Sequence, residues 1–297
     1  MHFKAVEAHL KQHGSLPVNM KFLIEGEEEV GSANLDNFIK AHKDLLKADV
    51  VVISDSPMFD RGIPSICYGL RGLAYFQIDL RGSKSDLHSG SFGGAVANPA
   101  MVLAQILSQM KDKSGRVKID GFYDDVVDLR PEERGEWEKL PFNEKKYRQD
   151  LGAPKLFGET GYSTLERVWA RPTFEVNGLL SGFTGEGAKT VLPAVSMAKV
   201  SMRLVPNQEP DKIADLFEAY LQKVAPKTVE LKLTRMHGGK PWMTAFQEEL
   251  GVPCVLFGIG LPDENAHAPD EKLDLSNFHG GVISAAYLYK EIGALKS

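Results

Sequence analysis

Cysteine is scarce in this chain: its 297 residues include two, Cys67 and Cys254, and both lie in apolar sequence. Two isolated cysteines argue against a disulfide framework and supply no CxxC-type zinc motif. The simplest interpretation is a pair of buried free thiols in a reduced compartment. We therefore expect a cytoplasmic protein.

Long hydrophobic runs and an excess of positive charge are also absent. No run of about 18 apolar residues occurs, which argues against a membrane span. The opening residues, Met1-His2-Phe3-Lys4, lead directly into helix-like periodicity without the apolar region of a signal peptide. The net charge is −5, with acids and bases interspersed, unlike the basic face of a nucleic-acid binder or a polybasic anchor. We expect neither a nucleic acid nor a membrane as a partner.

The length and the 43% hydrophobic content favour two cores, because single cores stop growing at about 250–300 residues. Two kinds of strand pattern occur. Apolar runs, typical of buried parallel strands, lie at 20–24, 50–53 and 255–257. Alternating patterns, typical of half-exposed antiparallel strands, lie at 73–81 and 198–204 and are accompanied by helices at 99–110 and 211–224 and a strand at 229–233.

The order of these patterns predicts the domain organisation. The alternating strands and their helices are typical of a small antiparallel sheet with two helices on one side. The parallel pattern returns near residue 252 and ends with a helix at about 276–292. We therefore predict an α/β fold in which a parallel-sheet domain (1–72 and 241–297) carries an inserted α+β, ferredoxin-like domain (73–240).

Carboxylates gather where the apolar runs end. Glu28 and Glu29 follow the first run, Asp55 follows the second, and the third leads into a loop that holds Asp263, Glu264, His267, Asp270 and Glu271. Taken singly, the glutamates are typical of a solvated helix face, Asp55 of a helix cap and His267 of a loop. Functional groups gather at the carboxyl ends of parallel strands, so together they predict a metal site. One of Glu28 and Glu29 could then bind a metal while the other faces its water.

Several ordered strings identify a family. The chain resembles, from its first residues almost to its last, the zinc dipeptidase and aminoacylase family that includes carnosinase, carboxypeptidase G and succinyl-diaminopimelate desuccinylase. The carnosinase-like dipeptidase branch is the most similar. The resemblance rests on IEGEEEVGS, VVISDS, YGLRG, DLHSG, GAKTVLPA, SMRLVP and GLPDENAHAPDEK.

The resemblance implies a site with two divalent metal ions, most simply zinc, with manganese or cobalt as alternatives. By the match, Glu28 is the general base, and Glu29 and His267 bind one metal. Asp55 binds the second metal. The expected activity is hydrolysis of a peptide or amide bond in dipeptides or N-acyl amino acids that bear a free carboxylate.

The inserted domain corresponds to the family's lid and dimerisation domain, which implies a homodimer. His88 matches the histidine that reaches into the partner subunit's site and stabilises the oxyanion of the tetrahedral intermediate. Arg203 and Thr190 match groups that hold the substrate's terminal carboxylate, a task that suits the guanidinium fork.

The sequence departs from the family pattern in two places. A His-x-Asp segment that supplies a histidine and a bridging aspartate would precede Met1, and a Gly-Gly-Ser substrate loop is skipped after Trp242. Catalytic zinc normally has three protein ligands, so an alternative expectation is a catalytically incomplete remnant that dimerises through the lid without turnover. Deacylation of N-acyl amino acids or carbamoyl hydrolysis is a further alternative, because the same site serves any amide.

Overall fold

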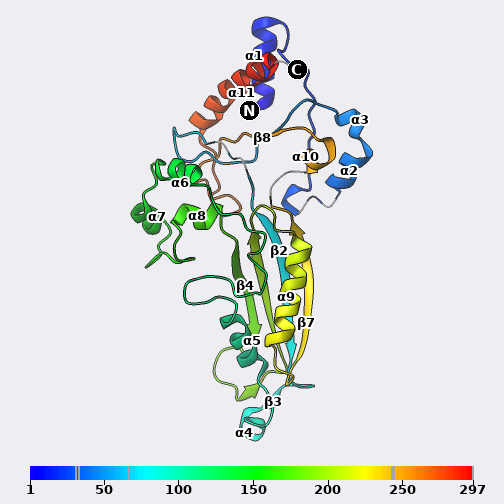
Figure 1. Cartoon of the computed structure of the whole chain (residues 1–297), viewed down its shortest axis with the longest axis vertical. Coiled ribbons are helices and arrows are strands. Elements are labelled where there is room, and N and C mark those ends of the chain that lie inside the picture. Colours follow the sequence, from blue (N-terminus) through cyan, green and yellow to red (C-terminus); the bar gives the residue numbers. More distant parts are fainter. Residues whose placement is uncertain (31, 33, 66, 68, 242–244, 296–297) are drawn as a thin grey trace. The chain divides into compact units, whose positions relative to one another are not determined.

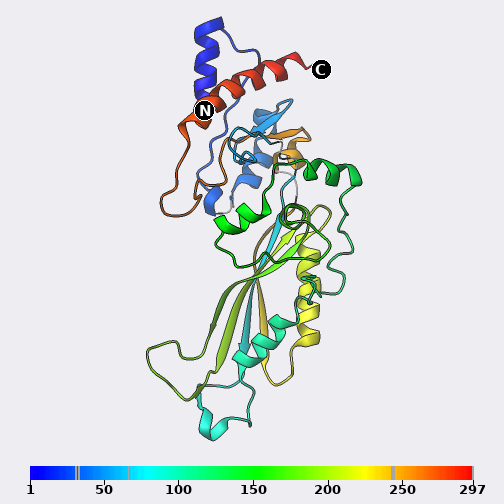
Figure 2. The same cartoon turned by 90° about the vertical axis from the view of Figure 1, so that its left-hand side faces the viewer.

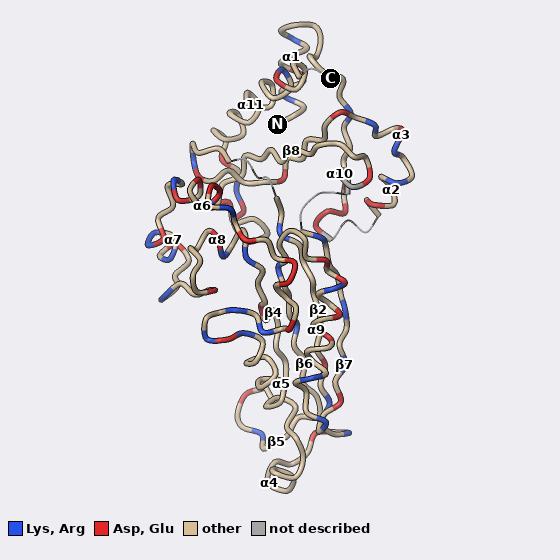
Figure 3. The backbone as a smooth tube through the Cα atoms, viewed as in Figure 1, with Lys and Arg blue, Asp and Glu red and all other residues tan. Residues whose placement is uncertain are grey.

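The structure, a computed structural model, describes all residues except 31, 33, 66, 68, 242–244 and 296–297. The chain forms two compact units (Figure 1). Unit 1 consists of residues 1–69 and 243–297, and unit 2 of residues 70–242. Acidic and basic residues are mixed along the described parts of both units (Figure 3). Within these described residues, no helix is both long and apolar enough to cross a bilayer.

Unit 2 is built on a four-stranded antiparallel sheet. Its strands, β2 (Gly72–Arg81), β4 (Thr173–Ser181), β6 (Val195–Leu204) and β7 (Glu230–Gly239), lie in the order β4-β6-β2-β7. The two central strands, β2 and β6, pair over their whole length, from Gly72 opposite Leu204 to Arg81 opposite Val195. This continuous register places alternate residues of both strands on one face of the sheet.

Two helices cover that face. α5 (Pro99–Ser108) and α9 (Pro210–Val224) lie on the same side of the sheet (Figure 2). Apolar side chains from the strands, such as Phe76 and Val200, are buried against Leu103 of α5 and Phe217 of α9. The start of α5 follows the expected capping chemistry, because Asn98 Oδ1 accepts a hydrogen bond from Ala100 N at 2.9 Å.

The rest of unit 2 consists of short elements around the sheet. A buried ion pair fixes part of this region: the Arg171 guanidinium donates to both carboxylate oxygens of Glu159, at 2.8 and 2.9 Å. The short elements of unit 2 are β3 (Leu87–His88), α4 (Ser89–Phe92), α6 (Pro131–Glu138), α7 (Glu144–Asp150), α8 (Thr164–Trp169) and β5 (Val191–Leu192).

Unit 1 contains a small parallel sheet and two packed helices. β1 (Val51–Ile53) and β8 (Cys254–Leu256) pair in parallel, and the helices α1 (His2–His13) and α11 (Leu275–Ala294) pack together through Ala5, Ala285 and Tyr289. The helix α1 ends at Gly14, whose φ of 71° is left-handed. The remaining elements are the 3₁₀ helix η1 (Glu28–Val30), α2 (Leu35–Ala41), α3 (Lys43–Leu46) and α10 (Ala245–Leu250).

The predicted fold class is confirmed, but one predicted strand is wrong. Residues 20–24 form no strand, and Phe22, Leu23 and Ile24 are exposed. An apolar run becomes a strand only when another backbone pairs with it. In the described chain β1 takes β8 as its partner, whereas this segment is tied to its surroundings by Lys21 Nζ, which donates to the carbonyls of Leu45 and Lys47.

A histidine links the helices of unit 1 to the end of β1. His2 Nδ1 lies 2.6 Å from the Tyr289 hydroxyl, and His2 Nε2 is hydrogen-bonded to Ser54 Oγ. Burial lowers the pKa of His2 below its ordinary value of 6.5 and raises the pKa of Tyr289 to about 12. Both groups are therefore neutral at pH 7 in the folded protein.

This pKa shift predicts a pH dependence of stability. Above pH 6.5, the pKa of His2 in the unfolded chain, the neutral His2 ring makes its full contribution to the free energy of unfolding. As the pH falls below this value, the unfolded chain binds a proton before the folded protein does. The stabilisation is therefore lost as the pH falls through the lower pKa of the folded protein. We expect the stability difference between the wild type and His2→Phe to shrink between pH 7.5 and pH 5 (urea unfolding). A difference that grows on acidification would contradict the assignment.

Candidate functional site

Glu28 and Glu29 lie in the short helix η1, and both are exposed. The turn that carries them is held by their neighbour Glu27. Its carboxylate accepts two hydrogen bonds from Asn34 Nδ2, at 2.9 and 2.8 Å, and its carbonyl accepts one from Ser32 N at 2.9 Å. The three adjacent glutamates are thus divided between structure and solvent: Glu27 closes the turn, while Glu28 and Glu29 stay available for a ligand.

The structure brings Glu29 and His267 together. Glu29 Oε2 lies 3.3 Å from His267 Nδ1, although 72% of the glutamate and 75% of the histidine side chain are exposed. His267 has a φ of 61°, a left-handed value that is unusual for a residue other than glycine. A carboxylate and an imidazole at this separation are two donors of the kind that zinc binds.

The loop around His267 is closed by contacts at its base. Lys272 N donates to Glu264 O at 3.0 Å, and Lys272 Nζ lies 2.7 Å from Asp263 Oδ2. This lysine lowers the pKa of Asp263 through the hydrogen bond between the two side chains. Asp263 is therefore engaged in holding the loop.

Asp55 lies two residues beyond the end of β1 and is exposed. Across the residues that the structure describes, no group of three or more His, Cys, Asp or Glu side chains could hold a metal ion. The chemistry of Glu29 and His267 thus fits a divalent ion as part of a ligand set. The structure does not bring Asp55 into that group.

The segment that carries Asp55 is held against the segment that follows β8. Phe257 N donates to Ile53 O at 2.8 Å, and Met58 N donates to Gly260 O at 2.8 Å. Between these bonds the backbones come so close that a Cβ on Gly258 would lie 1.4 Å from Ser56 O. Only glycine fits at this position.

Gly258→Ala should therefore disrupt unit 1. The added methyl group would displace the backbone of Ser56, next to Asp55, and we expect a loss of at least about 1–3 kcal/mol in the free energy of unfolding. Gly280→Ala is the matched control, because that glycine lies within α11 with open space around its Cβ position, where alanine should be neutral or stabilising. Equal urea unfolding curves for the two variants would contradict the close approach.

In unit 2, the pairing of β3 with β5 brings His88 and Thr190 together. His88 Nδ1 accepts a hydrogen bond from Gly90 N at 3.1 Å, and His88 Nε2 lies 3.3 Å from Thr190 Oγ1. Since Nδ1 is an acceptor, the proton of the neutral ring lies on Nε2. This N–H faces the Thr190 hydroxyl, and both side chains are exposed, so an incoming oxygen could reach the pair from solvent.

Arg203 lies near the end of β6, whereas the β3–β5 pair with His88 and Thr190 lies near its start. Arg203 is exposed and lies opposite Leu73 and Thr173. Burial, followed by the charge of Arg203, lowers the pKa of the nearby Arg71. Two guanidinium groups in one neighbourhood favour an anion.

Strand geometry gives the approximate separation between the His88–Thr190 pair and Arg203 in unit 2. The β3–β5 pair adjoins the start of β6, where Ala194 N donates to Asp86 Oδ1 at 2.8 Å. Arg203 lies eight residues beyond Val195, and at 3.3 Å per residue this separation is about 26 Å. The structure thus brings His88 to Thr190 but leaves Arg203 far from both.

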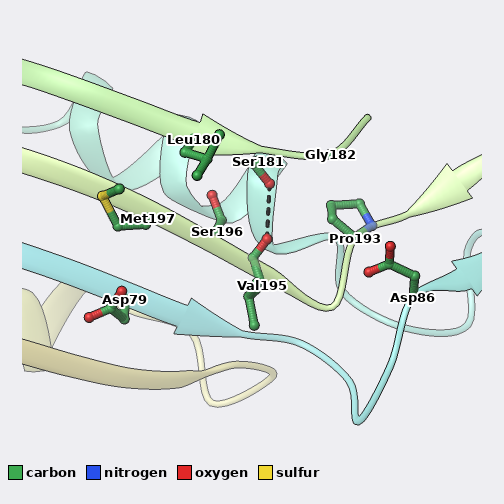
Figure 4. Close-up of a pocket in the computed structure, with 9 residues that line it drawn as sticks. All are labelled: Asp79, Asp86, Leu180, Ser181, Gly182, Pro193, Val195, Ser196 and Met197. Carbon is green, nitrogen blue, oxygen red and sulfur yellow. Dashed lines mark hydrogen bonds between the residues drawn. The ribbon is translucent and has the colours of Figure 1, made fainter. Parts of the chain in front are cut away.

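A cavity of about 290 Å³ lies near the junction of β4 and β6 (Figure 4). Its two carboxylates are already bound, because Asp79 accepts from Gln77 Nε2 at 3.0 Å and Asp86 accepts from Ala194 N. None of the predicted site residues lines the cavity. Its lining consists of Asp79, Asp86, Leu180, Ser181, Gly182, Pro193, Val195, Ser196 and Met197.

Comparison with known proteins identifies the class. Residues 68–229 match the family model of the M20 peptidase dimerisation domain. A Cys-Gly metallodipeptidase, dug1, of Schizosaccharomyces pombe is 32% identical over 94% of this chain and 67% of its own length. The human Beta-Ala-His dipeptidase is 28% identical over 98% of this chain and 65% of its own length. The chain therefore spans about two thirds of these curated relatives.

Solved structures agree with the sequence match. An M20 family metallo-carboxypeptidase, Sso-CP2 from Sulfolobus solfataricus, superposes with a TM-score of 0.88 at 31% identity, covering 99% of this chain and 75% of its own. Human carnosine dipeptidase 1 superposes with a TM-score of 0.82 at 28% identity, over 99% of this chain and 71% of its own. This chain belongs to the M20 family of metallopeptidases, in the carnosinase-like dipeptidase branch.

Proposed function

We propose that this chain acts as a metal-dependent dipeptidase that hydrolyses the peptide or amide bond of dipeptides or N-acyl amino acids with a free carboxylate. The observation that carries the proposal is the contact of Glu29 with His267 at 3.3 Å, with Glu28 next in the same turn. The names of the relatives, a Cys-Gly and a Beta-Ala-His dipeptidase, support small dipeptides as substrates. The domain roles follow: unit 1 is the catalytic domain and unit 2 the lid.

Glu29 and His267 would hold one divalent ion, and Asp55 would contribute to a second. Such an ion, whether zinc, manganese or cobalt, lowers the pKa of a coordinated water toward ~7. Glu28 is exposed beside Glu29 and would accept the proton of the attacking water as general base. The same carboxylic acid would then deliver that proton to the leaving amine.

Unit 2 would bind the remainder of the substrate. The Nε2–H of His88 would donate to the oxyanion of the tetrahedral intermediate, and Thr190 lies at the same place. Arg203 would pair with the substrate carboxylate in the bidentate geometry that a guanidinium allows. The neighbouring Arg71 adds positive charge.

The separation of about 26 Å along β6 favours a homodimer. One unit 2 cannot place His88 and Arg203 on the same dipeptide, so two chains would each contribute one of them to a site. The edge strand β4 is the surface that we propose for the contact. Its Val176, Leu179 and Leu180 are 45%, 63% and 58% exposed, whereas the other edge, β7, carries charged residues that discourage pairing.

The dimer proposal predicts that charges on β4 separate the chains. In the variant Leu179→Lys/Leu180→Lys we expect a shift from dimer to monomer in sedimentation, because two lysines on a strand edge oppose edge-to-edge pairing. Met236→Lys is the matched control: Met236 is an exposed apolar residue, 48% exposed, on the opposite edge strand β7. A monomeric wild type, or an equal effect of both variants, would contradict the role of β4.

Separate roles for the adjacent glutamates predict different responses to substitution. Glu28→Gln should lower dipeptide kcat/KM by about 10²–10⁴-fold, the contribution of a general base, without changing bound metal. Glu29→Gln should lower both. Bound metal is measured by elemental analysis after dialysis, and equal metal loss in the two variants would show that the roles are exchanged.

Glu27→Gln is the control for this experiment, because Glu27 belongs to the same run and a glutamine oxygen can still accept the hydrogen bond from Asn34 Nδ2 that holds the turn. It should change neither metal content nor the proton transfer. We expect at most one tightly bound ion per wild-type chain, since the described residues contain no group of three metal donors. The same observation favours the second candidate function, a remnant that dimerises without turnover, and such a remnant would retain almost no metal.

A further inference from the structure

His2 occupies an unusual position for a residue at the start of a helix. Its ring is half-buried and bonds on both sides, to the Tyr289 hydroxyl of α11 and to Ser54 Oγ just beyond β1. Tyr289 itself is only 2% exposed and belongs to the core between α1 and α11. The ring therefore ties the end of a strand to the buried core between α1 and α11.

The same ring also faces the end of the second parallel strand. The centroids of the His2 and Phe257 rings lie 6.1 Å apart, and Phe257 N donates to Ile53 O at 2.8 Å. His2 thus meets both strands at their carboxyl ends. Asp55 leaves β1 one residue after Ser54, and the loop that carries His267 leaves β8.

We propose that His2 is a positioning residue, which fixes the carboxyl end of β1, and with it Asp55, through the hydrogen-bonded chain Tyr289–His2–Ser54. The assignment of Asp55 as a metal ligand rests on the proposed function. The positioning role of His2 is independent of that function, because it follows from contacts within unit 1.

A second histidine of α1 provides the matched control. His9 Nε2 lies 3.0 Å from Ala286 O, and the His9 ring lies 6.2 Å from that of Tyr289. His9 therefore also joins α1 to α11, but no contact places it at Ser54. Loss of His9 should loosen the two helices without releasing the end of β1.

The experiment is amide hydrogen exchange on the full chain without added metal. The reporters are the amides of Phe257 and Met58, which bond to Ile53 O and Gly260 O on either side of Asp55. In His2→Phe we expect both to exchange roughly tenfold faster, as the loss of two hydrogen bonds predicts. In His9→Phe they should stay within about twofold of the wild type. Equal acceleration in the two variants would overturn the proposal.

Two further substitutions of His2 test which of its two hydrogen bonds, to Ser54 or to Tyr289, holds the end of β1. The amide of glutamine reaches about as far as Nε2 of histidine, and the amide of asparagine about as far as Nδ1. His2→Gln can therefore keep the bond to Ser54, whereas His2→Asn can keep only the bond to Tyr289. We expect the first to restore slow exchange at Phe257 and Met58 and the second to leave it fast. Rescue by asparagine alone would overturn the role of Ser54.

The exchange result is independent of catalysis. If the chain proves to have no peptidase activity, slow exchange that depends on His2 still supports the positioning role. If it hydrolyses dipeptides while His2→Phe leaves both amides unchanged, the proposed function stands and the positioning role fails.

Discussion

The parallel pairing of β1 with β8 is the constraint on which unit 1 depends. Three residues of each strand pair, yet the two segments stay together beyond the strands through the Met58–Gly260 bond and the contact of Ser56 with Gly258. A sheet of two short strands is weak in isolation. Its carboxyl ends are held together by the close backbone approach of Ser56 and Gly258, and the His2 ring contacts the same ends through Ser54 and Phe257.

Unit 2 depends on a different constraint, the ten-residue register between β2 and β6. The sheet and its two helices contain most of the buried apolar side chains among the described residues. A continuous, close-packed sheet holds the groups at its two ends apart at a constant separation. In the proposed dimer, His88 of one chain and Arg203 of the other would act on the same dipeptide.

The sequence predicted secondary structure best where a regular alternation of apolar residues faces a buried core. Regular alternation predicted β2 and β6, and Asn98-Pro99 predicted the start of α5. The strand β4 was missed because a bulge between Val176 and Gly178 breaks its alternation. The strand at 20–24 was wrongly predicted, since an apolar run does not reveal whether a partner is present. The contact of Glu29 with His267 joins distant segments, and the family resemblance predicted their pairing, whereas no local pattern indicated the contacts of Glu27 or His2.

The uninterrupted strand β6 also limits which insertions the sequence of this protein can tolerate. An insertion of two residues within it would lengthen the separation of the groups at its ends by about 6.6 Å, and an insertion of one would turn every following side chain to the opposite face. The exposed segment 182–189, in contrast, precedes Thr190 without lying between these groups. Length changes among homologues should therefore accumulate in that segment, and β6 should keep a constant length even where its residues differ.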